Sequence, residues 1–411
     1  MPLSRLFVIT LSHILYSFLC LHAHCFRVSA SSCSNESNTT PFSKSQHNFA
    51  ETRPSCGFEA AEHAWQTLRS DKDETANCCV TGNPYGFGSY LEAVAKDISN
   101  HFITWGVAPS ARLPKALQDV PPTRLSNNTC LDSILVSPEC AQGNLACFLD
   151  SIPIQHSTAS STECKAIPRY KIRMNGDDLK KRKSREALFE DGGKFWQAAS
   201  SLSRILRPSV RFEKCLGEER SKLWSRHPNK ESILTIHIRR GDSCRDGRRT
   251  GRKCSHGSFY AEAALRIMES APFDAVFLAT DSDEAITELR TAFAESGLVN
   301  LIPIVTRNIV RKNYAESFGR IEQAFEKQAL DPWVCFYDFL VDQILLSEGV
   351  GFVGKFTSNM DRIAYALQSA HARHFTSYTS LDAAWCWGGD GYSPDSYRKR
   401  GANDTMGMFP C

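Results

Sequence analysis

After about residue 230, short apolar runs alternate with segments in which apolar residues recur every three or four positions. A short, continuously apolar run predicts a buried strand, and the periodic spacing predicts an amphipathic helix. Strands that alternate with helices form a parallel sheet with crossover helices. We therefore predict a doubly wound α/β domain over residues 226–411. Its strands are expected at 233–238, 275–279, 301–305 and 350–353, and its helices begin near Ser258, Asp281, Asp331 and Ser358.

The residues before this domain follow other patterns. An apolar run at 6–21, followed by the small-residue tripeptide Val28-Ser29-Ala30, predicts a signal peptide over 1–30 or an uncleaved signal anchor in the membrane. Residues 31–55 are rich in Ser, Asn, Thr and Gln, which predicts a disordered stem. Residues 56–225 hold many cysteines, glycines and prolines, which predicts an irregular, disulfide-braced N-terminal domain. Amphipathic helices are expected in it at 90–102 and 194–206.

Cysteine usage agrees with entry into the secretory pathway. Removing Cys20 and Cys25 from the sixteen cysteines leaves fourteen, a density typical of an oxidising compartment, so we expect mostly disulfides. Cys244 and Cys254 bracket one short loop and are a plausible local pair. N-glycosylation acceptor sequences also fit a lumenal surface, and they stand at Asn35, Asn38, Asn127 and Asn403.

Charge limits the possible partners. The formal net charge of +3 is too small to predict nucleic-acid binding, because proteins that follow a phosphate backbone carry a concentrated basic excess. The basic run at 180–185 is interpreted as a solvated helix face, and the R-G-D tripeptide at 240–242 adjoins a buried strand, which disfavours an adhesion role. Any anion site must therefore be local.

One such site is predicted where the strand at 233–238 ends. Ligands of open α/β sheets bind outside the carboxyl ends of the strands. This strand has His237 near its end and is followed by Arg239, Arg240 and Asp242. Arginine forks bind phosphate through two parallel hydrogen bonds. The alternative is that one arginine pairs with Asp242 and the others are solvated.

Two further turns complete the candidate chemistry. The turn at 354–358 combines backbone N–H groups, hydroxyls and a helix N-terminus, which could accept a second phosphate, although a plain N-cap also explains Ser358. With the arginines, this turn would cradle a diphosphate without a metal ion. Asp281 and Asp283 match the D-x-D pattern of metal-dependent glycosyltransferases, but acidic residues are common in a first helical turn, so we expect no metal site.

Three blocks carry a family resemblance. H-I-R-R-G-D at 237–242, F-L-A-T-D-S-D at 277–283 and D-Q-I-L-L-S-E-G-V-G-F-V-G-K-F-T-S-N-M-D-R-I-A-Y at 342–365 resemble the conserved blocks of the α-1,6-fucosyltransferases and their O-fucosyltransferase relatives. Their order and spacing match over about residues 230–385. The resemblance implies a GT-B fold of two Rossmann-like halves, with the donor on the C-terminal half and the acceptor side in 56–225. It also implies metal-independent, inverting transfer from GDP-fucose.

The resemblance also implies residue roles. Arg239 would hold the β-phosphate, Arg240 would act at the diphosphate and the fucose, and Asp242 would orient or activate polar groups beside them. The general base is left open among Asp242, His256 and Asp281.

The remaining implied roles concern donor binding. His237 and Asp342 would recognise the guanine and ribose end, and Thr357 and Ser358 would bind phosphate oxygens, with Arg362 in support. A lysine follows the Arg-Arg-x-Asp block in the core-fucosylating enzymes, whereas Ser243 stands here, which disfavours N-glycan core specificity.

The resulting hypothesis is a lumenal glycosyltransferase of the Golgi or endoplasmic reticulum that uses GDP-fucose, needs no cofactor or metal, and modifies a glycan or glycoprotein. It would be soluble in the lumen or held as a type II membrane protein through residues 6–21. Two alternatives stay open: a transferase of the same fold with another nucleotide sugar, and a non-catalytic, secreted glycan-binding protein.

Overall fold

The computed structural model describes most of residues 193–385 and short stretches of the preceding chain. The described ranges are 48–49, 58–59, 61–62, 76–80, 94, 109–111, 117, 129–135, 140, 147–150, 165–166, 180, 193–227, 231–241, 244, 254–269, 271–297, 302–311, 321–383 and 385. The chain divides into two compact units, 1–46 and 47–411, and the second contains everything described below.

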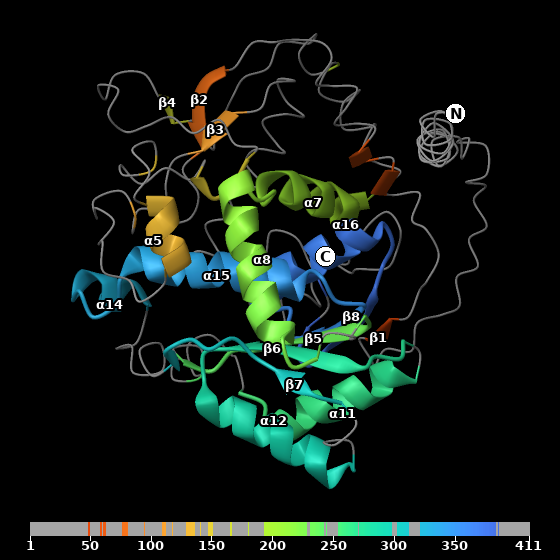
Figure 1. Ribbon diagram of the computed structural model, residues 1–411. Helices are drawn as coiled ribbons and strands as arrows, with labels where there is room; N and C mark the ends of the chain where they lie inside the picture. The colour runs from red at the N-terminus through yellow and green to blue at the C-terminus, as the bar shows by residue number, and fades with distance from the viewer. Residues whose placement is uncertain are drawn as a thin grey trace, which may run out of the picture. The chain divides into compact units, whose positions relative to one another are not determined.

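The main sheet has six strands in the order β1-β9-β8-β5-β6-β7 (Figure 1). Five of them run parallel, and β1 pairs antiparallel with β9. The strand order reverses direction between β5 and β8, which makes their carboxyl ends the topological switch point where open sheets bind ligands. The strands are β1 (Asn48–Phe49), β5 (Ile233–Ile238), β6 (Ala275–Thr280), β7 (Ile304–Val305), β8 (Gly351–Gly354) and β9 (Ser377–Ser380).

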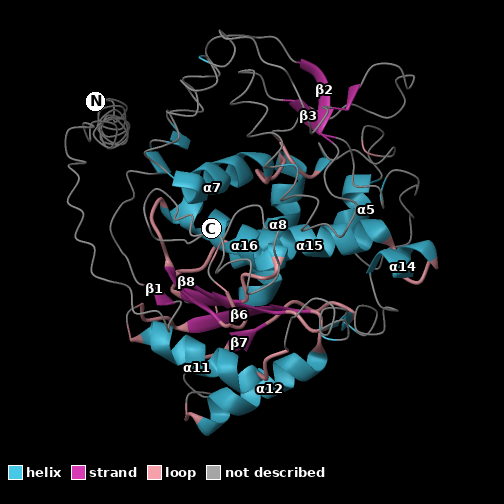
Figure 2. Ribbon diagram, turned by 180° about the vertical axis from the view of Figure 1, so that it is seen from behind, coloured by secondary structure: helices cyan, strands magenta, loops and turns pink. Residues whose placement is uncertain are grey.

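Helices cover both faces of this sheet (Figures 1 and 2). Leu234, Ile236 and Ile238 of β5 pack in one apolar cluster with α11 (Gly257–Met268) and α12 (Asp283–Glu295). The intervening residues, Thr235 and His237, face the opposite layer. That layer contains α7 (Gly193–Ile205), α8 (Val210–Trp224), α15 (Pro332–Leu346) and α16 (Asn359–Ala372).

Local sequence signals set the helix starts. Asp331 caps α15 by accepting hydrogen bonds from the backbone nitrogens of Trp333 (2.7 Å) and Val334 (3.2 Å), with Pro332 at the first helical position. Ser282 caps α12 in the same way through the nitrogen of Ala285, at 3.3 Å. The predicted α/β class, the parallel sheet and the helices of residues 258–367 are therefore confirmed.

Several elements differ from the sequence-based expectation. The strand expected at 301–305 is limited to Ile304–Val305, and neither β9 nor α8 was expected. β9 reads S-Y-T-S, which lacks an apolar run, yet all of its residues are buried. β1 lies inside the segment predicted to be a disordered stem and pairs with Tyr378 and Thr379. The helix expected at 90–102 lies outside the described residues, apart from Val94.

The described N-terminal part contains α5 (Thr129–Leu135) and a second, smaller parallel sheet. Its strand order is β3-β2-β4, with β2 at Ala76–Val80, β3 at Pro109–Ala111 and β4 at Lys165–Ala166. The expected disulfides are present: Cys130–Cys215 joins α5 to α8, and Cys140–Cys147 closes a short loop.

The apolar core continues across the predicted domain boundary at residue 226. Leu131 of α5, Trp196 of α7 and Phe212 of α8 share one cluster with Trp333 of α15 and Tyr365 of α16. Helices assigned to the N-terminal domain thus pack on the helical layer of the C-terminal sheet, while the division into 56–225 and 226–411 stays a prediction.

Within the part of the chain described, no helix combines the length and apolarity needed to cross a bilayer. The predicted signal segment at 6–21 lies outside that part.

Candidate functional site

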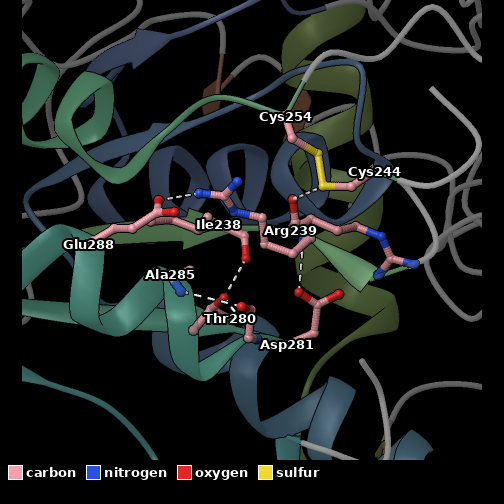
Figure 3. The surroundings of a disulfide bond; sticks show 10 residues. Ile238, Arg239, Cys244, Cys254, Thr280, Asp281, Ala285 and Glu288 are labelled. Carbon is pink, nitrogen blue, oxygen red and sulfur yellow. Dashed lines mark hydrogen bonds and ion pairs between the residues drawn. A yellow bond between two sulfur atoms is a disulfide. The ribbon is translucent and has the colours of Figure 1, made fainter. Parts of the chain in front are cut away.

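The turn after β5 is held by backbone bonds and a disulfide. The backbone nitrogen of Arg240 donates to Oδ1 of Asp281 at 2.7 Å, and the carbonyl of Arg240 accepts from the nitrogen of Cys244 at 2.9 Å. Cys244 is bonded to Cys254, which confirms the predicted pair (Figure 3). The two predicted arginines therefore stand on a braced turn at the switch point. Asp242 lies outside the described residues.

The two arginines point in different directions. Nη2 of Arg240 forms an ion pair with Oε2 of Glu288 on α12, whereas the Arg239 side chain extends away from Glu288 (Figure 3). Both residues are partly exposed. The pairing of Arg240 with Glu288 could not be predicted, because Glu288 lies 48 residues further along the chain and carries no local signal of its own.

The D-x-D carboxylates bind separate partners. Asp281 accepts from the Arg240 nitrogen, while Asp283 is 74% exposed and lies 3.6 Å from Nη1 of Arg311. Between them, Ser282 serves as the cap of α12. No cluster of three or more His, Cys, Asp or Glu side chains suited to a metal ion occurs among the residues described. Metal independence stays a prediction.

A buried ion pair joins the two sides of the switch point. Nδ1 of His237, at the end of β5, lies 3.0 Å from Oδ2 of Asp361, in the first turn of α16, and the two side chains are 4% and 1% exposed. Burial alone would lower the pKa of His237, but the charge of Asp361 outweighs it and raises this pKa above 6.5. Asp361 belongs to the quoted motif block, but no role was predicted for it.

Gly354, the last residue of β8, makes room for that pair. A Cβ at this position would overlap Oδ1 of Asp361 and would lie 2.7 Å from the ring of Phe352. The residue must therefore lack a side chain for the carboxylate to reach His237 across the strand end.

The turn after β8 is anchored by Asp382. The hydroxyl of Thr357 donates to Oδ2 of Asp382, and the nitrogen of Phe356 donates to the Ser380 hydroxyl at 3.2 Å. Ser358 is the N-cap residue of α16, but its side chain makes no capping hydrogen bond. The plain N-cap interpretation therefore does not account for the Ser358 hydroxyl.

Arg362 braces this turn from behind. Its side chain is 1% exposed, and its Nη1 donates to the carbonyl of Phe356, while Trp385 Nε1 donates to the carbonyl of Arg362 at 3.1 Å. The hydroxyl of Tyr365 donates to the carbonyl of Thr376 at 3.1 Å. These contacts fit a supporting role and place the Arg362 guanidinium within the protein.

Asp342 belongs to a buried charge cluster on α15. Its Oδ1 lies 3.1 Å from Nη1 of Arg307, which also contacts Asp338 at 2.8 Å and Glu219 of α8 at 3.3 Å. Burial raises the pKa of the Asp342 carboxyl, and Arg307 opposes that rise. Arg307 and the neighbouring Arg311 were not predicted as site residues. The only sequence feature that could have indicated them is their position after the carboxyl end of the short strand β7.

His256, a candidate general base, lies at the start of α11. Its Nδ1 accepts from the nitrogen of Ser258 at 3.3 Å, and its Nε2 lies 3.6 Å from Oε1 of Glu288. The side chain is 58% exposed. Asp281, the second candidate, has Oδ1 engaged by Arg240, so neither residue is singled out.

Comparison with protein-family models gave no match, and comparison with curated proteins gave none either. Similar solved structures include POFUT1 in complex with GDP (13% identity, 77% of this chain and 100% of that chain, TM-score 0.37). NodZ fucosyltransferase from Bradyrhizobium matches at 16% identity over 71% of this chain and 93% of that chain, with a TM-score of 0.30. A further POFUT1 structure with GDP matches at 15% identity over 45% of this chain and 50% of that chain, with a TM-score of 0.30.

Proposed function

We propose that this chain transfers fucose from GDP-fucose to a glycan or glycoprotein acceptor without a metal ion. One observation carries the proposal: β5 and β8 are neighbours at the switch point, so the His237–Arg240 turn and the Lys355–Ser358 turn meet at one sheet edge. The His237–Asp361 pair links the end of β5 to the first turn of α16, the helix that follows the Lys355–Ser358 turn. These are the two turns whose motifs resemble the donor-binding blocks of fucosyltransferases.

The leaving group would be a diphosphate, and the site offers positive charge for it. Arg239 and Arg240 follow β5, and Lys355 precedes α16, whose N-terminus adds the positive end of a helix dipole. Fixed donors of this kind stabilise charge that develops on a leaving group, which is the task a metal ion performs elsewhere. In the same turn, Ser358 would bind a phosphate oxygen, and Thr357 would do so by turning its hydroxyl hydrogen away from Asp382, to which it donates in this structure.

The reaction would be a single displacement. An acceptor hydroxyl attacks the anomeric carbon of fucose on the face opposite the diphosphate, the bond from that carbon to the diphosphate oxygen breaks, and GDP leaves with the bonding electrons. The acceptor proton passes to a general base, for which Asp242, His256 and Asp281 are the candidates. Inversion at the anomeric carbon follows from this geometry.

The guanosine end would be bound by His237 and Asp342. A carboxylate can accept hydrogen bonds from both N1–H and N2–H of guanine. Arg307 fixes the Asp342 carboxylate through Oδ1, at 3.1 Å, and favours its ionised form, which is the form that accepts. This role would discriminate guanine from uracil and cytosine.

The proposed compartment is the lumen of the Golgi or endoplasmic reticulum. Three disulfides occur in the described residues, Cys130–Cys215, Cys140–Cys147 and Cys244–Cys254, and such bonds persist in oxidising compartments. Residues 6–21 would direct the chain there as a signal peptide or anchor.

A donor screen tests the function against both alternatives. The purified chain is incubated with GDP-fucose, GDP-mannose, UDP-N-acetylglucosamine and UDP-galactose, and release of the nucleoside diphosphate is measured with EDTA present. We expect release from GDP-fucose to exceed that from each other donor by at least about tenfold, because a site built for one donor leaves polar groups unpaired with another. Faster release from another nucleotide sugar would support the alternative of a transferase with a different donor. No release from any of the four donors would support the alternative of a non-catalytic glycan-binding protein.

A further inference from the structure

Glu288 contacts several residues of the candidate site on the α11 and α12 side of the sheet. Its Oε2 pairs with Nη2 of Arg240 and accepts a hydrogen bond from the nitrogen of Gly257 at 2.7 Å, and its Oε1 lies 3.6 Å from Nε2 of His256. The side chain is only 13% exposed. One carboxylate on α12 therefore joins the turn after β5 to the first turn of α11.

The backbone is arranged so that this carboxylate can reach both partners. A Cβ on Gly257 would lie 2.6 Å from Cβ of Glu288 and 2.7 Å from the nitrogen of Leu289, so only glycine lets the start of α11 approach α12 this closely. The disulfide Cys244–Cys254 ends two residues before the α11 cap and begins four residues after Arg240. The two ends of the intervening loop are thereby fixed.

Arg240 is held at both of its ends. Its backbone nitrogen is bound by Asp281 at 2.7 Å, and one guanidinium nitrogen is bound by Glu288. Fixing an arginine side chain costs rotamer freedom, and an ion pair made before the donor binds removes that loss from the reaction itself. The guanidinium has five N–H donors, so the pair with Glu288 leaves others for a phosphate.

We propose that Glu288 is a positioning residue that orients the Arg240 guanidinium toward the donor diphosphate. This inference rests on the proposed function. Glu288 acts through Arg240 and touches no reacting atom. Its own negative charge opposes an anionic ligand, so its contribution lies in orienting Arg240 for the transition state more than in holding GDP.

A purely structural role would make a different prediction. If Glu288 only joined α12 to α11, its bond to the Gly257 nitrogen would be the one that matters. Glu288→Gln keeps an oxygen that can accept from that nitrogen but loses the charge that holds Arg240. A structural role therefore predicts little change in kcat for this variant, whereas a positioning role predicts a large one.

The experiment compares Glu288→Gln with Glu284→Gln in the full chain. Glu284 lies one turn earlier on α12 and is exposed, so it provides the same charge change away from the site. We expect Glu288→Gln to lower kcat for GDP-fucose turnover by about 10- to 100-fold, the range that misplacement of a catalytic group costs. The Kd for GDP, measured by calorimetry, should stay within about threefold of wild type. Glu284→Gln should match wild type in both.

Two results would overturn the inference. One is a folded Glu288→Gln protein with kcat within twofold of wild type, and the other is a loss of kcat/KM caused by weaker GDP binding alone. If Glu288→Gln does not fold, Glu288→Asp retains the charge with a shorter reach, and the same loss of kcat is expected of it, with unchanged kcat again counting against the role. A wild-type chain that neither binds GDP nor turns over GDP-fucose would instead refute the proposed function, independently of Glu288.

Discussion

Replacing Arg240 by alanine is expected to lower kcat/KM for transfer from GDP-fucose by about 100-fold or more. The variant removes a cation that the braced turn after β5 presents at the switch point, where the diphosphate would gain charge as the bond to fucose breaks. It also leaves the Glu288 carboxylate without its arginine partner, which adds a less compensated negative charge beside the turn after β5. Steady-state kinetics with GDP-fucose and an acceptor measure the effect.

The fork geometry of arginine gives a second test of the same residue. Arg240→Lys keeps the charge but cannot make two parallel hydrogen bonds to a phosphate, so we expect only partial recovery. Arg266→Ala is the matched control, because Arg266 lies on the outer side of α11 and pairs with Glu262, at 2.6 Å, away from the turn. An Arg240→Ala protein that keeps more than about a third of wild-type activity would contradict the proposed role of this residue.

Replacing Asp361 by asparagine is expected to lower the free energy of unfolding by about 3 kcal/mol, because it breaks a buried ion pair and leaves His237 without its counter-charge. The pair lies where β5 meets α16, so the loss should also loosen the two turns that we propose bind the diphosphate. Urea denaturation of the two proteins measures the difference in free energy.

This destabilisation should depend on pH in a defined direction. The pKa of His237 in the folded protein is raised above 6.5 by the charge of Asp361, against the effect of burial and of Arg239. A raised histidine pKa stabilises the fold fully below pH 6.5, and the contribution declines as the pH rises toward the folded pKa, by about 1.4 kcal/mol per pH unit. The difference between wild type and Asp361→Asn should therefore be larger at pH 6 than at pH 8.

Asp283→Asn is the control for the loss of a carboxylate. Asp283 is 74% exposed, and its removal should change stability by no more than about 0.5 kcal/mol. A destabilisation by Asp361→Asn that is equally small, or one that grows between pH 6 and pH 8, would show that His237 and Asp361 do not act as an ion pair.

The part of the fold that could be predicted is the part with strong local signals. The run I-L-T-I-H-I is β5 over its full predicted length, and the Asp331-Pro332 pair begins α15 as expected. By contrast, β9 and β1 are held by strand pairing and burial and not by an apolar pattern, and β7 is a two-residue strand inside a longer apolar run. Propensity was outweighed there by tertiary context.

The candidate site divides in the same way. Residues at or after the strand ends, such as His237, Arg240 and Ser358, could be predicted to lie at one place, because the carboxyl ends of parallel strands meet at one edge. Their partners could not, because the choice of partner is made across the fold: Glu288 lies on α12, and Arg307 follows β7 and faces Asp342 on α15. An ion pair between residues more than thirty positions apart produces no periodic pattern of apolar and polar positions, so it cannot be predicted from such a pattern.

Isothermal titration calorimetry of the purified protein with GDP, in the presence of EDTA, tests the central claim most directly. A metal-free diphosphate cradle at the β5–β8 switch point predicts saturable binding of one GDP per chain, unchanged when EDTA is replaced by Mn²⁺. An absence of binding, or binding that requires Mn²⁺, would contradict it.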